Sequence, residues 1–230
     1  MQLAHRAVFG SLFSLTVACA ATDAKDDVEQ DVAYQHADGG LPDAAPDATA
    51  DDASGDASTF VDPRDGQTYR TVRFGDATWF AENLRFAVDG GSFCYGDDEA
   101  SCERDGQLYL FSAALEACPP GSHLGSDAEW KALEAAVGME ADQLGLSGYA
   151  TPRGTDEGAT LKRTDGFAAR MAGFRAGSSY DARDDRTYFW TSTTQGGEVW
   201  RRRISAGEST VFRFTNPPST FAISVRCVAD

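Results

Sequence analysis

Apolar and polar residues alternate in short runs over the later part of the chain, and most of these runs are bounded by Gly or Pro. Residues 69–74 and 77–80 flank Gly75 and Asp76, a two-residue turn signal, so they predict an antiparallel hairpin. Four further runs are typical of strands: residues 189–192, 198–204, 210–214 and 221–228. In the last run, Phe221, Ile223, Val225 and Cys227 would share one face of a single strand.

A first helical pattern begins at Leu108. Leu108, Phe111, Leu115 and Cys118 are spaced by three, four and three residues, which places them on one helix face. Two prolines and Gly121 follow and end this helix. Cys118 is therefore expected to point toward the core.

A second helix is predicted directly after Ser126. Ser126 and Glu129 form the pattern of a capping box, in which each side chain hydrogen-bonds the backbone N–H of the other residue. Trp130, Leu133 and Val137 then form one apolar stripe, and a glycine ends the helix. This stripe is expected to face the core.

The segment of residues 139–188 is rich in Gly, Asp, Ser and Thr, which predicts a long loop region with short elements rather than a second domain. Two central helices, an opening hairpin and several later strands together predict an α+β fold with antiparallel strands and long loops. We expect one such domain over residues 59–230.

The start of the chain has a different pattern. Residues 1–18 begin weakly basic and continue as an apolar run too short to span a bilayer, which predicts a secretory signal peptide. The sequence Thr16-Val17-Ala18-Cys19 resembles the lipobox of bacterial lipoproteins, whose cysteine is lipidated. We expect Cys19 to anchor the protein to a bacterial membrane, facing the periplasm or the cell surface. The alternative is an ordinary signal peptide cut nearby, which leaves Cys19 as an odd thiol.

Residues 19–58 form an acidic segment with almost no large apolar side chains. Eleven Asp or Glu and a single Lys lie between residues 20 and 58, so much of the net charge of −16 falls here. Such a segment cannot bury enough apolar surface to offset its ordering entropy, and we expect a disordered linker. It lacks the D-x-D-x-D-G loop of a calcium motif. The negative net charge argues against nucleic acid as a partner.

Four cysteines remain within the predicted domain, an even number that suits disulfides in an oxidising compartment. Cys94 and Cys102 flank a polar loop, eight residues apart, and are expected to pair with each other. Pairing Cys118 with Cys227 would close a loop of about 100 residues. A zinc site would normally show close C-x-x-C spacing with histidines, and the sequence has neither.

Six segments resemble, in the same order, the Fibrobacter succinogenes major paralogous domain. They are residues 60–69, 79–84, 106–109, 118–130, 189–193 and 224–230, so the resemblance covers nearly all of residues 60–230. It implies a secreted or lipid-anchored bacterial surface protein of a family without an established activity. It also implies a C-type lectin-like fold, in which a helix-borne cysteine bonds one in the closing strand, as Cys118 and Cys227 would.

The sequence offers little for catalysis. His123 lies in one of the family-like segments, which favours a packing or hydrogen-bonding role over that of a base. The calcium-binding triplets of sugar-binding C-type lectins, Glu-Pro-Asn or Gln-Pro-Asp and Trp-Asn-Asp, do not occur. We therefore assign no catalytic residue, no metal and no cofactor.

Four arginines fall on two of the predicted strands. Arg201, Arg202, Arg203 and Arg213 could form a basic patch, but strand alternation sends Arg202 to the opposite side from Arg201 and Arg203. We interpret them as a solvated face that resists aggregation.

Together these patterns predict a non-catalytic cell-surface lipoprotein that displays a binding module for a glycan or a surface protein. The ligand is expected to contact aromatic and acidic residues of the long loops, namely Tyr149, Tyr180, Asp181, Asp184, Asp185 and Tyr188. Two alternatives stay open. One is an envelope-acting enzyme that uses thiol redox chemistry or hydrolyses a polymer, and the other is a structural spacer of a surface layer.

Overall fold

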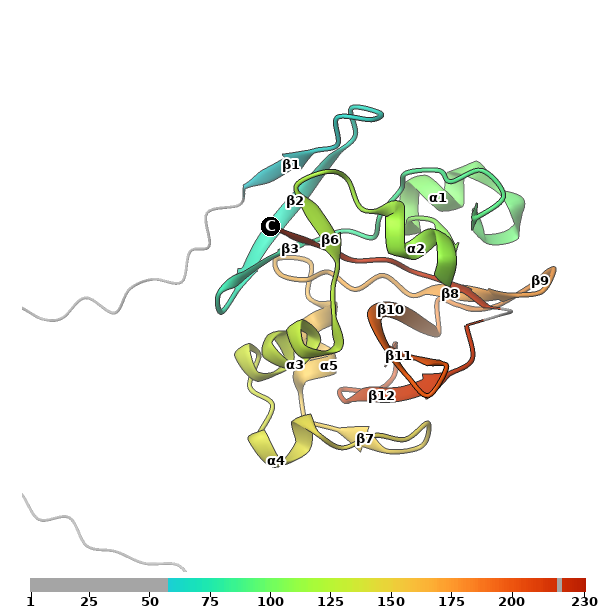
Figure 1. The fold of residues 1–230 in the computed structure, drawn as a ribbon. Helices are drawn as coiled ribbons and strands as arrows, with labels where there is room; N and C mark the ends of the chain where they lie inside the picture. Colours follow the sequence, from blue (N-terminus) through green and yellow to red (C-terminus); the bar gives the residue numbers. More distant parts are fainter. Residues whose placement is uncertain (1–57, 219–220) are drawn as a thin grey trace, which may run out of the picture. The chain divides into compact units, whose positions relative to one another are not determined.

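The computed structural model describes residues 58–218 and 221–230 (Figure 1). The predicted signal peptide, Cys19 and the linker up to residue 57 lie outside the described residues. The described part contains both helices and β-sheets, which confirms the α+β class. None of its helices has the length and apolar character needed to cross a membrane.

Four of the five strands of the first sheet come from the two ends of the described chain, and the fifth, β6, comes from its middle. This sheet contains the predicted hairpin, β2 and β3, whose Gly75 adopts a positive φ of 58° in the turn. All its pairings are antiparallel, in the order β1-β2-β3-β14-β6. The bounds are β1 Thr59–Val61, β2 Thr68–Phe74, β3 Ala77–Phe80, β6 Ser122–Leu124 and β14 Cys227–Ala229.

The second sheet is larger and carries most of the later strands. Its order is β4-β5-β13-β8-β10-β11-β12-β7, and β9 pairs with β8 outside this path. The pairing of β8 with β10 is parallel, and the others are antiparallel. The bounds are β4 Ser92–Phe93, β5 Leu108–Leu110, β7 Pro152–Arg153, β8 Ala172–Ala176, β9 Ser179–Arg183, β10 Arg186–Gln195, β11 Glu198–Ser205, β12 Val211–Asn216 and β13 Phe221–Ile223.

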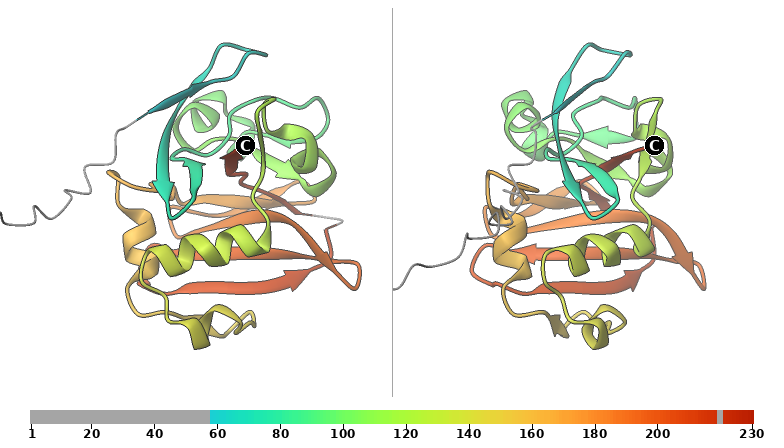
Figure 2. Two further views of the ribbon diagram at one scale, coloured as in Figure 1. Left: turned by 60° about the vertical axis from the view of Figure 1, so that its left-hand side comes forward. Right: turned by 90° about the vertical axis from the view of Figure 1, so that its left-hand side faces the viewer.

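Short helices surround these sheets, and α3 runs across the face of β10, β11 and β12 (Figure 2). As predicted, α3 follows Ser126 and ends before Gly138. The helices are the 3₁₀ turn η1 Tyr95–Asp97 and the α-helices α1 Glu99–Asp105, α2 Phe111–Ala117, α3 Asp127–Ala136, α4 Ala141–Leu144 and α5 Glu157–Lys162.

The first predicted helix is shorter than its apolar pattern indicates. Leu108 belongs to β5, where neighbouring Tyr109 pairs with Ser92 of β4 and Ile223 of β13. The helix starts only at Phe111, and Leu115 is 49% exposed rather than part of a buried face. Pairing with two strands from distant parts of the sequence overrides the local helical spacing.

The strand predicted over residues 221–228 is also wrong as a single element. It forms β13 in the larger sheet and β14 in the smaller one, so its residues do not share one face of one strand. Arg226 lies between the two strands, fully buried, and donates hydrogen bonds to the backbone oxygens of Phe80 and Ala168 and to the Asn83 side chain. Burial lowers the pKa of Arg226 to about 9.

The region of residues 139–188 contains short elements, as predicted, and three of them, β7, β8 and β9, are strands of the larger sheet. It contains α5 and the hairpin of β8 and β9, and β8 pairs with both β13 and β10 inside the larger sheet. The Gly-rich composition misses β8 because Gly173, with a φ of 70°, sits within it at a close approach to the backbone of Asp181.

Two disulfides tie these elements together, with the predicted pairing. Cys94 bonds Cys102 across η1 and the start of α1. Cys118, at the end of α2, bonds Cys227 of β14, 109 residues later. The second bond therefore joins the end of α2 to the smaller sheet, and both of its cysteines pack in the same hydrophobic cluster.

Candidate functional site

The N-terminus of α3 is fixed by the predicted capping box. The Ser126 hydroxyl accepts a hydrogen bond from the backbone N–H of Glu129 at 3.2 Å, and the Glu129 carboxylate accepts one from the backbone N–H of Ser126 at 2.7 Å. Trp130 and Leu133 then pack into the core, as the apolar stripe predicts. The cap thus fixes the residue at which α3 begins, and with it the helix face that packs against the core.

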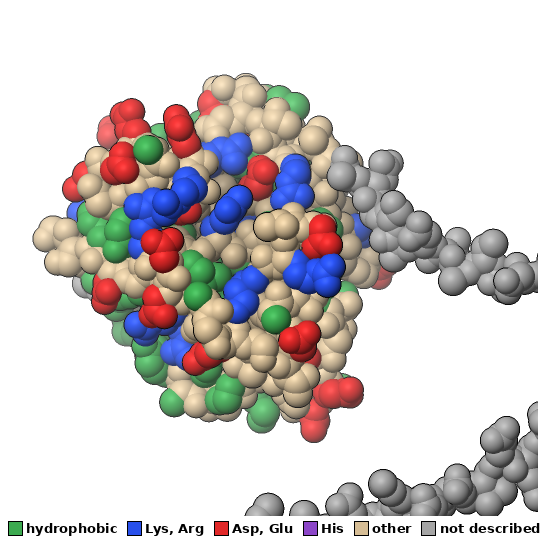
Figure 3. All heavy atoms as spheres, turned by 180° about the vertical axis from the view of Figure 1, so that it is seen from behind, with side chains coloured by type: hydrophobic (Ala, Val, Ile, Leu, Met, Phe, Trp, Pro, Cys, Tyr) green, Lys and Arg blue, Asp and Glu red, His purple; other side chains and the backbone are tan. Residues whose placement is uncertain are grey.

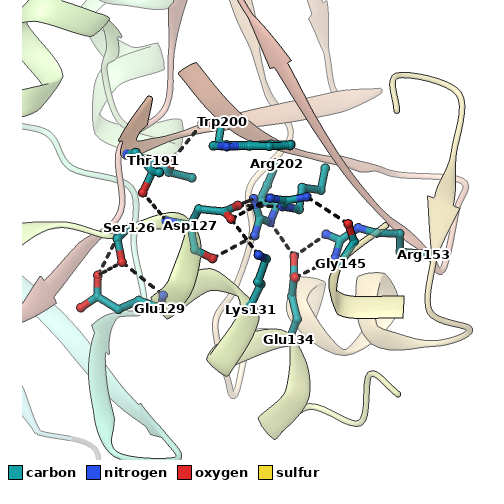
Figure 4. Close-up of polar contacts among 12 residues, drawn as sticks. Ser126, Asp127, Glu129, Lys131, Glu134, Gly145, Arg153, Thr191, Trp200 and Arg202 are labelled. Carbon is teal, nitrogen blue, oxygen red and sulfur yellow. Dashed lines mark hydrogen bonds and ion pairs between the residues drawn. The ribbon is translucent and has the colours of Figure 1, made fainter. Parts of the chain in front are cut away.

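A buried ion network joins α3 to that sheet (Figure 4). Asp127 accepts hydrogen bonds from Arg202 at 2.8 Å and, through both oxygens, from Arg213 at 2.8 Å each. Glu134 accepts from Arg202 at 2.6 Å and from both terminal nitrogens of Arg153 at 2.7 and 2.9 Å. Every one of these side chains is at least nine-tenths buried.

The network consists of opposite charges from four elements, namely α3, β7, β11 and β12. Burial alone would raise the pKa of the Asp127 carboxyl, but the hydrogen bonds and charges of Arg213 and Arg202 hold it well below its usual range. Both carboxylates are fully engaged by arginines, and the network lies beneath α3. Its role is therefore to hold the helix on the sheet.

His123 forms a second polar link beside the cap. Its ring nitrogens lie 2.6 Å from an Asp230 carboxylate oxygen and 2.7 Å from a Glu129 carboxylate oxygen. Burial lowers the pKa of His123, but these two hydrogen bonds outweigh it and raise the pKa above its ordinary value. Both ring nitrogens are engaged, which agrees with the hydrogen-bonding role predicted for His123.

The prediction of a solvated arginine face is wrong. Arg201, Arg202, Arg203 and Arg213 are 2%, 0%, 8% and 5% exposed. The predicted alternation itself holds, because Arg202 joins the network under α3 while Arg201 and Arg203 lie on the opposite face of β11. The sheet is covered on both faces, so no position on this part of β11 is available for solvation.

A cavity of about 220 Å³ opens on the Arg201 face of the sheet. Two residues predicted to contact a ligand meet there: Tyr149, which is 55% exposed, and Tyr188, which is buried. Burial, and after it the Tyr149 hydroxyl, raises the pKa of Tyr188. The lining comprises Tyr149, Phe174, Tyr188, Arg201, Phe214, Asn216 and Phe221.

Arg201 is the charged group of this cavity. Its guanidinium lies 4.2 Å from the ring centre of Trp190 and 5.0 Å from that of Phe221. One terminal nitrogen donates to the backbone oxygen of Pro217 at 2.9 Å, whereas the buried Nε has no hydrogen-bond partner among the described residues. Burial lowers the pKa of Arg201 to about 10, so the side chain stays charged at neutral pH.

The remaining predicted ligand residues lie elsewhere, on β9 and the turn that follows it. Tyr180 donates its hydroxyl to Asp97 and packs against the Tyr95 ring at 5.2 Å. The predicted acidic residues of this hairpin, Asp181, Asp184 and Asp185, are exposed and do not line the aromatic cavity. The structure therefore brings together only the two tyrosines, Tyr149 and Tyr188.

Two other hollows lie away from the aromatic cavity. One, of about 790 Å³, is open, has both polar and apolar walls, and includes Cys94 and Cys102 in its lining. Another, of about 370 Å³, lies between Arg104, Lys162 and Asp184. On the face shown in Figure 3, Lys and Arg side chains lie among Asp and Glu side chains, so that surface has mixed charge. Within residues 58–218 and 221–230, no group of three or more His, Cys, Asp or Glu side chains could hold a metal ion.

Sequence reasoning missed several walls of the aromatic cavity. Phe214 and Asn216 belong to β12, and Phe174 belongs to β8, in a segment predicted as loop. The sequence signal that could have pointed to the cavity was the alternation of Arg201 and Arg203 with Arg202, because it indicated two different environments on the two faces of one strand.

Comparison with known proteins identifies the domain. The model of the Fibrobacter succinogenes major domain matches residues 72–229, more than half of the chain. Searches of the curated proteins and of the solved structures found no significant match. The match spans the larger sheet, the capped helix α3 and the disulfide between Cys118 and Cys227, and it includes the smaller sheet except β1 and the first residues of β2. The chain therefore belongs to the Fibrobacter succinogenes major domain family.

Proposed function

We propose that this protein is a non-catalytic binding module displayed at a bacterial cell surface, and that its ligand is a glycan. The observation that carries the proposal is the aromatic cavity beside Arg201, with Tyr149 at its rim and Tyr188 in its wall. Ligand sites are typically concave, mostly apolar and supplied with a few polar groups that fix orientation. Here Arg201, Asn216 and the tyrosine hydroxyls are those groups.

The geometry of the rings supports a flat, partly apolar ligand. Tyr149 lies edge-on to Phe214 with ring centres 5.2 Å apart, and Tyr188 lies perpendicular to Phe174 at 5.4 Å. A sugar ring offers apolar C–H faces for such rings and hydroxyls for the polar groups. By contrast, the network at Asp127 has both carboxylates engaged and lies beneath α3, so it offers nothing to a ligand.

The proposal extends to the fold and to the anchor. A C-type lectin-like arrangement is supported by the bond between Cys118, at the end of α2, and Cys227 in the last strand. A signal peptide over residues 1–18 and a lipid on Cys19 would place the domain outside the cell. A Cys19→Ser protein is expected to leave the membrane fraction, and its retention there would contradict lipidation.

A glycan array probed with the full, oxidised chain tests the binding function. Tyr149→Ala is expected to weaken binding to any glycan retained by the wild type about threefold to tenfold, because it removes one aromatic contact. Tyr180→Ala is the matched control, since it removes a tyrosine that does not line the cavity. An array and an envelope pull-down that both stay blank would contradict the proposal.

A second candidate is an envelope thiol enzyme, because Cys94 and Cys102 line the open cavity of about 790 Å³. It predicts that mild reductant frees two thiols while the Cys118–Cys227 bond stays closed. Thiol titration of the native, folded chain separates the two functions. A bond between Cys94 and Cys102 that resists such reduction excludes the redox function.

A further inference from the structure

The positive charge of Arg201 has no counter-ion among the described residues. Its polar contact is the backbone oxygen of Pro217, and its buried Nε has no acceptor. Glu198 is the nearby carboxylate that acts on this charge, and its own side chain is engaged with Thr215. A buried charge without a partner is destabilising, so an anionic group that reached Arg201 would gain a charge-assisted hydrogen bond there.

Arg203 adds a second positive charge on the same face of β11. It is 8% exposed, its guanidinium lies 3.6 Å from the Phe212 ring centre, and its Nε also has no acceptor among the described residues. Its carboxylate partner, Glu208, lies at the long distance of 3.9 Å. The local field on this side of the strand therefore favours an anion over a cation.

The size and walls of the cavity limit what that anion can be. A volume of about 220 Å³ is smaller than the roughly 300–1,000 Å³ of sites for drug-sized ligands, so it suits a single ring. Phe174, Phe214 and Phe221 provide apolar walls, which a bare inorganic anion would leave without contacts. The geometry thus calls for a ring that carries an acidic group.

We propose that this cavity binds a carboxylate-bearing sugar ring of an acidic polysaccharide, with Arg201 holding the carboxylate and Tyr149 and Tyr188 contacting the ring. A planar guanidinium matches the geometry of a carboxylate and forms charge-assisted hydrogen bonds with it. The Asn216 amide, which also lines the cavity, can donate to and accept from ring hydroxyls. This inference rests on the proposed glycan-binding function and names its ligand class.

The test is calorimetric titration of the full chain with hexuronate oligosaccharides and with neutral hexose oligosaccharides of the same length and linkage. The hexuronates are expected to bind more tightly. Arg201→Met is expected to weaken hexuronate binding about 10-fold to 100-fold, the loss typical for a hydrogen bond to a charged group. The same variant is expected to weaken binding of the neutral sugars by a smaller factor, because they carry no carboxylate for the lost charge. Arg201→Lys is expected to retain part of the hexuronate affinity, because it keeps the positive charge but loses the planar guanidinium with its paired N–H donors.

Arg175→Met is the matched control. Arg175 also stacks on an aromatic ring, 3.8 Å from the Phe93 centre, and also has a buried Nε without a partner, but it does not line the cavity. Its replacement is expected to leave hexuronate affinity within twofold of the wild type. Thermal unfolding of each variant checks that a lost affinity is not a lost fold.

The outcomes distinguish failure of the acidic-sugar inference from failure of the proposed glycan-binding function. Equal binding of neutral and acidic sugars, or hexuronate binding that survives Arg201→Met in a folded protein, overturns the role of Arg201 and leaves glycan binding standing. Binding of neither class overturns the acidic-sugar inference, and a blank glycan array in addition overturns the proposed function.

Discussion

The two faces of β11 each bury an arginine, but they surround it with different groups. On one face, Arg202 is fully buried and reaches both Asp127 and Glu134 of α3. On the other, Arg201 is just as deeply buried, yet it contacts Trp190, Phe221 and a single backbone oxygen. Of these two consecutive arginines, Arg202 is matched, because carboxylates neutralise its charge, and Arg201 is unmatched, because no carboxylate among the described residues pairs with it.

The difference lies in what covers each face. α3 brings carboxylates to the Arg202 face, whereas aromatic rings and the cavity lie on the Arg201 face. Matched buried charges stabilise a docked helix only while all partners are present. An unmatched charge beside a cavity is instead free to act on a ligand, which is the role proposed above for Arg201. We therefore expect changes on the first face to alter stability and changes on the second to alter affinity.

The largest effect is expected from Glu134→Ala, which leaves Arg153 and Arg202 without this carboxylate. The free energy of unfolding should fall by about 3–5 kcal/mol, the usual cost of breaking a buried pair from one side. Urea denaturation measures it. Glu116→Ala, at an exposed position of α2, is the control and should change stability by less than about 0.5 kcal/mol. A loss below 1 kcal/mol for Glu134→Ala would contradict the claim that these buried ion pairs hold α3 on the sheet.

Acid should weaken the same face. The folded-state pKa of Asp127 is lowered, so its contribution is present above its unfolded pKa, near 4, and is lost as the pH falls toward the lowered value. A contribution of about 2 kcal/mol is typical for such a carboxylate. The difference in unfolding free energy between the wild type and Asp127→Asn should therefore shrink between pH 5 and pH 2. A difference that stays constant would show that the Asp127 charge does not hold α3.

A smaller effect is expected from the cap that orients α3. Ser126→Ala removes the acceptor for the Glu129 backbone N–H and should lower the unfolding free energy by about 1 kcal/mol. Ser112→Ala, at an exposed position of α2, is the control, with no change in unfolding free energy expected. Equal unfolding free energies of the two variants would show that the Ser126 cap does not stabilise α3.

The smallest stability effect is expected on the unmatched face. Arg201→Met replaces a buried charge with an apolar side chain of similar length and should change the unfolding free energy by less than about 1 kcal/mol. Arg202→Met, one residue along, removes contacts with two carboxylates and should be more destabilising. Chemical denaturation of both variants tests the contrast, and equal losses would mean that the two faces do not differ.

Local and pairwise features were readable from the sequence. The capping box of Ser126 and Glu129 is a pattern over four residues, and the hairpin at Gly75 is a pattern over two. The disulfide pairs were also predictable, because four cysteines leave few choices and two of them flank one polar loop. The segments that resemble the family identified the domain that the comparison then confirmed.

Strand limits near the domain centre were not readable in this way. Leu108 has helical spacing but lies in β5, and residues 221–228 have the alternation of one strand but serve two sheets. In both cases the partner strands come from distant parts of the chain. Local periodicity reports which positions can be buried, and it does not report which element they pair with.

The arginines mark this limit most clearly. The sequence by itself determined that Arg201 and Arg202 point to opposite sides, because successive residues of a strand alternate. Only the tertiary structure decided that both sides are buried, that α3 brings carboxylates to one of them, and that rings from β8, β12 and β13 surround the other. The physical reason is that a charge is matched or left unmatched by groups far away in the sequence, which meet it only when the sheet and its covering elements assemble.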